Sequence, residues 1–372
     1  MNKFFATFKK LDKLILLAVC LLGVISVVML ESTVYDDGLV LNFSDGRPVW
    51  IQLIAYFLGF IALICVQYID YRFFEGLEKY LYIASILILL LVYVPGLGQE
   101  RYGSRAWINL GITTLQPSEF VKILFVLIMA GYLSSHRDEL NKFTGVIKSV
   151  IFAAPIILIV LKEDLGSALV FIVMWIFMIF FAGIDYKIFF QSALACLAAI
   201  PIIYKFLDDY QKERIEAFLH PENLSLSGNY QVWQSKVAIG SGGLTGKGLF
   251  HGTQKNLDFI PVQQSDFIYS VVVEELGFLG GAFVVVIYGF LLIRFIKIIR
   301  DSSDLYGALI VIGFASMFLC QIFENIAMTM GLMPVTGITL PFLSGGGTSV
   351  IASMISVGII LNVGVNSKAL QF

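Results

Sequence analysis

The chain has 372 residues, of which 58% are hydrophobic and only 14% are charged, and its formal net charge is −2. Soluble globular proteins carry about 25% charged residues, so this composition excludes an ordinary soluble protein and indicates a membrane protein. A net charge near zero also gives no indication of a nucleic-acid partner.

Apolar segments long enough to cross a bilayer recur along the whole chain. A transmembrane helix needs about 20 mostly apolar residues. The hydropathy pattern predicts about ten spans, at residues 13–31, 49–68, 79–97, 117–134, 145–161, 165–183, 187–206, 267–296, 304–330 and 345–365. We therefore expect an all-α integral membrane protein that forms a single domain over residues 1–372.

The basic residues predict how these spans are oriented. Lysine and arginine gather in alternate short loops, for example at Lys10, Arg137 and Arg294. Because such loops stay on the cytoplasmic side, we expect both termini in the cytoplasm. The long polar connection between the seventh and eighth spans, residues 207–266, is then extracytoplasmic. A connection of that length is usually functional.

Two ionisable residues lie at the start of the fourth predicted span. Pro117 suits the first turn of a helix, so Glu119 and Lys122 lie one turn apart on one helix face. Charged groups this close to the bilayer interior are costly unless they are paired or face water. The two residues are therefore either a structural ion pair or part of the wall of a polar cavity.

Asp164 stands between the fifth and sixth predicted spans. A short acceptor at the start of a helix satisfies free N–H groups, so Asp164 either caps the sixth span or faces a ligand.

The long connection also contains a glycine-rich stretch that ends near Lys247. It fails the test for a P-loop, because Ser241 replaces the first glycine and Gly248 replaces the Ser or Thr that would hold magnesium. Lys247 therefore belongs either to a plain turn or to a flexible turn that approaches a phosphate.

Asp266 lies at the expected boundary between water and membrane, directly before an apolar helix. It is either an N-cap or a general base, since partial desolvation raises the pKa of a carboxylate. Further along, residues 333–349 are rich in proline and glycine. Irregular backbone at membrane depth persists only where it is buried or lines a cavity. We therefore expect the long connection and this segment to share one outward-facing cavity.

Taken together, these segments resemble the SEDS family (shape, elongation, division and sporulation), and in particular its elongation branch. The resemblance rests on Arg105–Ile108, Gln116–Glu119 with Lys122, Asp164–Ala168, Arg214–Ile215 with Pro221–Glu222, Gln234–Gly248, Gly252–Gln254, Asp266–Ile268, Glu274–Gly277 and Pro334–Ser344. They follow the order of the family over nearly the whole chain. One departure is Pro261–Val262, where the family usually has Pro-Glu.

The resemblance implies an inverting peptidoglycan glycosyltransferase that polymerises lipid II on the outer face of the bacterial cytoplasmic membrane during cell elongation. It implies a class B penicillin-binding protein as partner, with membrane lipids around both, and catalysis that depends on Asp266. No nucleotide or organic cofactor is expected.

One carboxylate is enough for this reaction, because it takes the proton of the attacking hydroxyl. Pyrophosphate is a good leaving group that needs cations rather than an acid. Lys122, Arg214 and Lys247 are expected to supply them, or else a divalent cation, Mg²⁺ or Mn²⁺. Glu119 and Asp164 complete the expected substrate-binding set. The alternative function is a flippase that carries lipid II across the bilayer, since intramembrane charges also suit a transporter.

Overall fold

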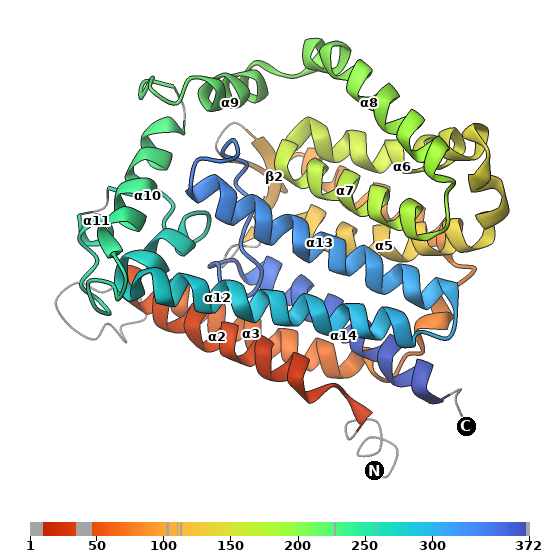
Figure 1. Cartoon of the computed structure of the whole chain (residues 1–372), viewed down its shortest axis with the longest axis horizontal. Coiled ribbons are helices and arrows are strands. Elements are labelled where there is room, and N and C mark those ends of the chain that lie inside the picture. Colours follow the sequence, from red (N-terminus) through yellow and green to blue (C-terminus); the bar gives the residue numbers. More distant parts are fainter. Residues whose placement is uncertain are drawn as a thin grey trace.

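A computed structural model describes residues 10–34, 47–101, 104–109, 111, 114–226, 228–257 and 259–369. Most of these residues are helical (Figure 1). The long helices are α2 (Lys13–Val34), α3 (Arg47–Val66), α4 (Glu78–Leu90), α5 (Pro117–Ser135), α6 (Phe143–Glu163), α7 (Leu165–Phe181), α8 (Tyr186–Phe206), α12 (Ile268–Asp301), α13 (Leu305–Thr329) and α14 (Gly347–Ala369). Three short 3₁₀ helices, η1 (Tyr71–Phe74), η2 (Leu91–Tyr93) and η3 (Arg137–Asn141), lie in connections.

Each of the ten predicted spans overlaps one long helix, and the prediction of an all-α membrane protein is confirmed. Within the described part of the chain, seven helices are long and apolar enough to cross a membrane. Their apolar ranges are Lys13–Val34, Pro48–Val66, Pro117–Ser135, Phe143–Glu163, Ile268–Asp301, Leu305–Thr329 and Gly347–Asn366. The total of ten stays a prediction, because α4 and α7 have only 13 and 17 residues and α8 is not among the seven.

The long helices form a bundle in which α13 is central (Figure 1). Helix α13 packs on α5, α7 and α12, while α3 packs along α14. Most apolar side chains of α13 are buried, as expected for a helix that packs on several others, although Leu319 and Phe323 are exposed. Figure 1 shows the start of α2 and the end of α14 at the same end of the bundle. The side of the membrane on which that end lies stays a prediction.

The connection between α8 and α12 is largely helical. It contains α9 (Asp209–Leu219), α10 (Asn229–Gly242) and α11 (Thr253–Asn256). Helix α9 begins with a capping box. The side chain of Asp208 accepts the backbone N–H of Gln211, and the side chain of Gln211 accepts the backbone N–H of Asp208. Helix α10 packs against α12. Figure 1 shows α8 to α11 running along the outside of the bundle, from α7 round to the start of α12.

A small antiparallel sheet, which the sequence analysis did not predict, lies between α4 and α5. Its strands are β1 (Gly98–Arg101), β2 (Ser104–Asn109) and β3 (Thr114–Leu115), in the order β1-β2-β3. Strand β2 carries the Arg105–Ile108 motif and contacts both α5 and α6. The sheet therefore covers the ends of these helices, next to the connection that holds Asp164.

The segment between α13 and α14 is irregular, as the proline and glycine content predicted. Its second half is also buried: Leu340, Phe342 and Leu343 are at most 1% exposed. Phe342 has a φ of +63°, an uncommon backbone conformation for a bulky residue. The second half of the segment therefore packs inside the protein, whereas Leu332 in its first half is exposed.

Candidate functional site

Asp266 lies at the end of a tight turn, two residues before α12 begins. Its backbone N–H donates to the carbonyl of Val262 at 3.2 Å, and Val262 has a φ of +56°. A positive φ is a genuine outlier for a β-branched residue, and such strain gathers at functional sites. The Ser265 hydroxyl donates to Oδ1 of Asp266 at 2.8 Å. This hydrogen bond, which comes from within the turn, occupies Oδ1 of the carboxylate.

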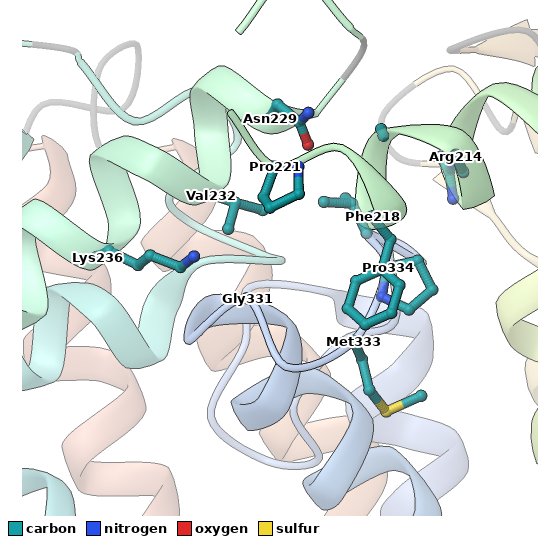
Figure 2. A pocket seen from close by; sticks show the side chains of 11 residues that line it. Arg214, Phe218, Pro221, Asn229, Val232, Lys236, Gly331, Met333 and Pro334 are labelled. Carbon is teal, nitrogen blue, oxygen red and sulfur yellow. The ribbon is translucent and has the colours of Figure 1, made fainter. Parts of the chain in front are cut away.

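The irregular segment after α13 holds this turn in place. Asn325 of α13 is fully buried and donates its amide hydrogens to the carbonyls of Asp266, at 2.9 Å, and Ile338, at 2.8 Å. Ser344 donates its hydroxyl to the carbonyl of Ser265. These bonds join the turn to a helix and to the segment after it. The long connection therefore contacts residues 333–349, and residues of both segments line one pocket (Figure 2). That this pocket faces outward stays a prediction.

The other oxygen of Asp266 lies near glycine. A Cβ built on Gly337 would lie 3.6 Å from Oδ2 of Asp266, and Gly337 has a φ of +75°. Glycine adopts this conformation without strain and leaves space beside the carboxylate. A reactant can therefore approach Oδ2 more closely than a side chain here would allow.

Burial raises the pKa of Asp266, while the Ser265 hydroxyl and the Arg214 charge pull it down and the Asp164 charge raises it again. Arg214 therefore lies close enough to Asp266 for its charge to act on the carboxyl. The guanidinium of Arg214 stacks 4.4 Å from the ring centroid of Tyr210, a cation–π contact that fixes its position. Burial also raises the pKa of Tyr210, and Arg214 opposes that rise.

Asp164 caps α7, which is one of its two predicted roles. Its carboxylate accepts the backbone N–H of Gly166 at 3.0 Å and the hydroxyl of Ser167 at 2.6 Å. Gln116 donates to the same carboxylate at 3.3 Å. The charge of Asp164 also acts on Asp266, so the cap lies within electrostatic reach of the site. Its role toward a ligand stays a prediction.

Glu119 and Lys122 form a buried ion pair. Nζ of Lys122 lies 2.8 Å from Oε1 of Glu119, and the two side chains are 1% and 8% exposed. The electrostatic neighbours of this pair include Glu324 of α13, on which both Lys122 and Asp164 act. The lysine is therefore neutralised by a carboxylate, and a substrate would have to compete with Glu119 for it.

Lys247 is also paired, in a separate cluster. Its Nζ lies 2.7 Å from Oε1 of Glu274 and 2.6 Å from the hydroxyl of Thr253. A parallel pair joins Lys255 to Glu275 at 2.9 Å, and both glutamates are fully buried. The glycine-rich stretch is therefore anchored to α12 by the Lys247–Glu274 pair, and α11 by the Lys255–Glu275 pair. Within the described residues, no interaction links Lys247 to Asp266, so the structure does not bring these two predicted site residues together.

Over the described ranges, no group of three or more His, Cys, Asp and Glu side chains is arranged to hold a metal ion. Magnesium is often bound by one or two carboxylates together with substrate phosphates, so the divalent cation stays a prediction. We assign no step to it.

The structure adds residues that the sequence analysis did not assign to the site. Asn325 was recognisable as a polar residue inside an apolar span. Tyr210 carried no such signal, because it lies in a polar helix where tyrosine is ordinary. Only the fold shows that Tyr210 supports Arg214.

Comparison with known proteins identifies the family of the chain. The family model of the FtsW, RodA and SpoVE cell cycle proteins matches residues 12–369. The peptidoglycan glycosyltransferase MrdB of Escherichia coli K12 is 34% identical over 351 residues, which cover 92% of this chain and 93% of MrdB.

Two solved structures share the fold. A chain of a peptidoglycan synthase complex that coordinates polymerisation and crosslinking has a TM-score of 0.82 at 28% identity, covering 96% of this chain and 98% of its own. The rod shape determining protein RodA of Thermus thermophilus has a TM-score of 0.68 at 28% identity, covering 95% and 96%. The chain thus belongs to the family of FtsW, RodA and SpoVE cell cycle proteins, the SEDS family that its motifs resemble.

Proposed function

We propose that this chain is a peptidoglycan glycosyltransferase of the RodA type. It polymerises lipid II into glycan strands on the outer face of the cytoplasmic membrane, with both of its termini in the cytoplasm. Two findings support the proposal: the similarity to MrdB, which is named for this activity, and the similarity to RodA. The similar chain in a synthase complex supports a crosslinking partner, the role of a class B penicillin-binding protein.

The reaction joins two lipid-linked sugars. A hydroxyl of one sugar attacks the anomeric carbon of the other, the bond from that carbon to the diphosphate oxygen breaks, and the hydroxyl proton passes to a base. A single displacement inverts the configuration at the anomeric carbon. Diphosphate needs no proton from an acid, so one carboxylate is sufficient.

Asp266 is our choice for that base, and its geometry is the observation that carries the proposal. The turn and Asn325 fix its backbone, Gly337 leaves space beside Oδ2, and burial raises its pKa. A general base works best when its pKa approaches the working pH. Arg214 provides a positive charge close to the same carboxylate, which suits a site that releases a diphosphate.

Reconstitution separates this function from that of a flippase. The protein, with its crosslinking partner, is placed in proteoliposomes that carry labelled lipid II. Glycan polymers are resolved by gel electrophoresis, and lipid II translocation is followed in parallel by quenching of a fluorophore on its peptide. The proposal expects polymer at a rate that increases with the amount of protein. Translocation without any polymer would overturn it in favour of a flippase.

A further inference from the structure

The irregular segment after α13 is held by side chains from several helices. Backbone carbonyls that are buried away from water need hydrogen-bond donors, and irregular backbone does not supply all of them itself. Here side chains supply them, in bonds from Asn325 to Ile338, from Tyr288 to Pro341, from Tyr56 to Phe342, from Ser26 to Leu343 and from Gln52 to Ser344. These donors belong to α2, α3, α12 and α13. The position of the segment is therefore fixed by the surrounding bundle.

Gln52 of α3 binds the segment on both sides of Gly345. Its side chain is only 1% exposed. Nε2 of Gln52 donates to the carbonyl of Ser344 at 3.0 Å, and Oε1 accepts the backbone N–H of Gly346 at 3.2 Å. Nε2 also donates to the hydroxyl of Ser26 on α2, at 3.0 Å. The amide of Gln52 therefore holds both peptide units that flank Gly345.

One of these peptide units also holds the turn that carries Asp266. The peptide bond between Ser344 and Gly345 is planar and rigid, and its N–H donates to the carbonyl of Gln264 at 2.7 Å. A Cβ on Gly345 would lie 2.9 Å from the same carbonyl oxygen, so the two backbones approach too closely for a side chain. A shift of this peptide unit is therefore passed directly to the turn.

We propose that Gln52 is a positioning residue for glycan synthesis, which fixes Asp266 through the peptide unit between Ser344 and Gly345. The inference rests on the proposed function, in which Asp266 takes the proton of the attacking hydroxyl. Because Gln52 acts on Asp266 through the backbone, its loss should change how fast bound lipid II reacts rather than how tightly lipid II binds. The effect should therefore appear in kcat and not in KM.

The test compares the same substitution at two glutamines. Gln52→Met removes the hydrogen bonds of the amide and keeps a side chain of similar length. Gln67→Met is the matched control, because Gln67 directly follows α3, about 22 Å from Gln52 along the helix axis. Its amide also donates to another helix, to the carbonyl of Gly358 in α14 at 2.8 Å. The control thus loses an interhelical hydrogen bond of the same kind at the other end of α3.

Two properties of each protein are measured. Values of kcat and KM for lipid II come from initial rates of polymer formation in proteoliposomes that contain the crosslinking partner. Backbone hydrogen exchange is followed by mass spectrometry without substrate, on peptides that cover residues 262–267 and 340–347. Size-exclusion chromatography checks that each variant is folded.

We expect Gln52→Met to lower kcat about 10- to 100-fold and to leave KM within about twofold of the wild type. Exchange should become faster in both peptides. Gln67→Met should match the wild type in kcat and in both peptides. A kcat of Gln52→Met equal to that of Gln67→Met would overturn the proposal, and so would a loss that appears in KM alone.

Gln52→Asn covers the case in which Gln52→Met does not fold. It keeps an amide in the buried site but draws it back by one carbon–carbon bond. Its kcat should fall about threefold or more at unchanged KM, because the shorter amide cannot hold both sides of Gly345. A wild-type kcat together with wild-type exchange would overturn the proposal here as well.

The two proposals fail in different ways. Exchange is measured without substrate, so faster exchange in Gln52→Met, beside a wild type that makes no glycan, contradicts only the proposed function. Normal glycan synthesis by Gln52→Met, with unchanged exchange, contradicts only the role of Gln52.

Discussion

Removing the lysine of the buried ion pair should destabilise the protein strongly. In Lys122→Met, Glu119 loses the ammonium group that lies 2.8 Å from it, and its side chain is only 8% exposed. Breaking a buried pair by removing one partner costs about 3–5 kcal/mol, because the other charge is left uncompensated. We expect a loss of unfolding free energy in that range.

The double variant Glu119→Gln with Lys122→Met should recover most of the loss, because no unpaired charge then remains. Replacing a whole buried pair by neutral groups is often close to neutral in stability. The matched control is Lys148→Met, which breaks the ion pair with Glu139, also 2.8 Å long but with side chains 62% and 48% exposed. Exposed pairs contribute little, so this variant should not differ measurably from the wild type.

Unfolding is followed by tryptophan fluorescence during SDS titration in mixed micelles, with all four proteins in the same lipid. The reasoning would be refuted if Lys122→Met were as stable as Lys148→Met. It would also be refuted if the double variant were no more stable than Lys122→Met, since the loss would then not come from an unpaired Glu119.

Three further outcomes follow from the site and from α12. Asn325→Ala should lower kcat for glycan synthesis about 10- to 100-fold with little change in KM. The Asp266 carbonyl loses its 2.9 Å hydrogen bond from the Asn325 amide, and small displacements of a catalytic group are costly. A kcat within twofold of the wild type would contradict this. Burial raises the pKa of Asp266 above 3.8, and a general base must be ionised to accept a proton. We therefore expect kcat to fall as the pH is lowered through that raised pKa. A kcat that stays constant down to about pH 4 would show that the pKa of the carboxyl is not raised. Gly277→Ala should cost more than about 2 kcal/mol in the SDS titration, since φ is +70° and the new Cβ would lie 2.3 Å from the backbone nitrogen of Gly246. Gly289→Ala, with nothing within 4 Å of its Cβ, should cost nothing and serves as the control.

The sequence predicted the helices well, because the length of an apolar run is a local property that the bilayer constrains directly. It did not predict the sheet between α4 and α5, whose strands have only 4, 6 and 2 residues. Short strands carry little periodicity, and their pairing depends on neighbours that a local pattern does not contain. The helices of residues 207–266 were missed for a similar reason. Helix α10 has no continuous apolar face and is stabilised by packing on α12.

The site shows the same division between local and tertiary information. Asp266 and the segment after α13 could be singled out because proline, glycine and a carboxylate are conspicuous in an apolar sequence, while the catalytic role of Asp266 stays a prediction. Whether each lysine forms an ion pair was not predictable. Lys122 is paired with a residue three positions away, Lys247 with one 27 positions away, and Lys236 with none of the described carboxylates. Which lysine is paired depends on side-chain positions that only the folded chain determines.

The central claim is that Asp266 is the base of a glycan polymerase. The most direct measurement compares the wild type with Asp266→Asn in polymer formation from labelled lipid II, with the crosslinking partner present. Asparagine keeps the shape and removes the negative charge, so the variant should fold normally and make no detectable polymer. Polymer formation by Asp266→Asn at the wild-type rate would contradict the account.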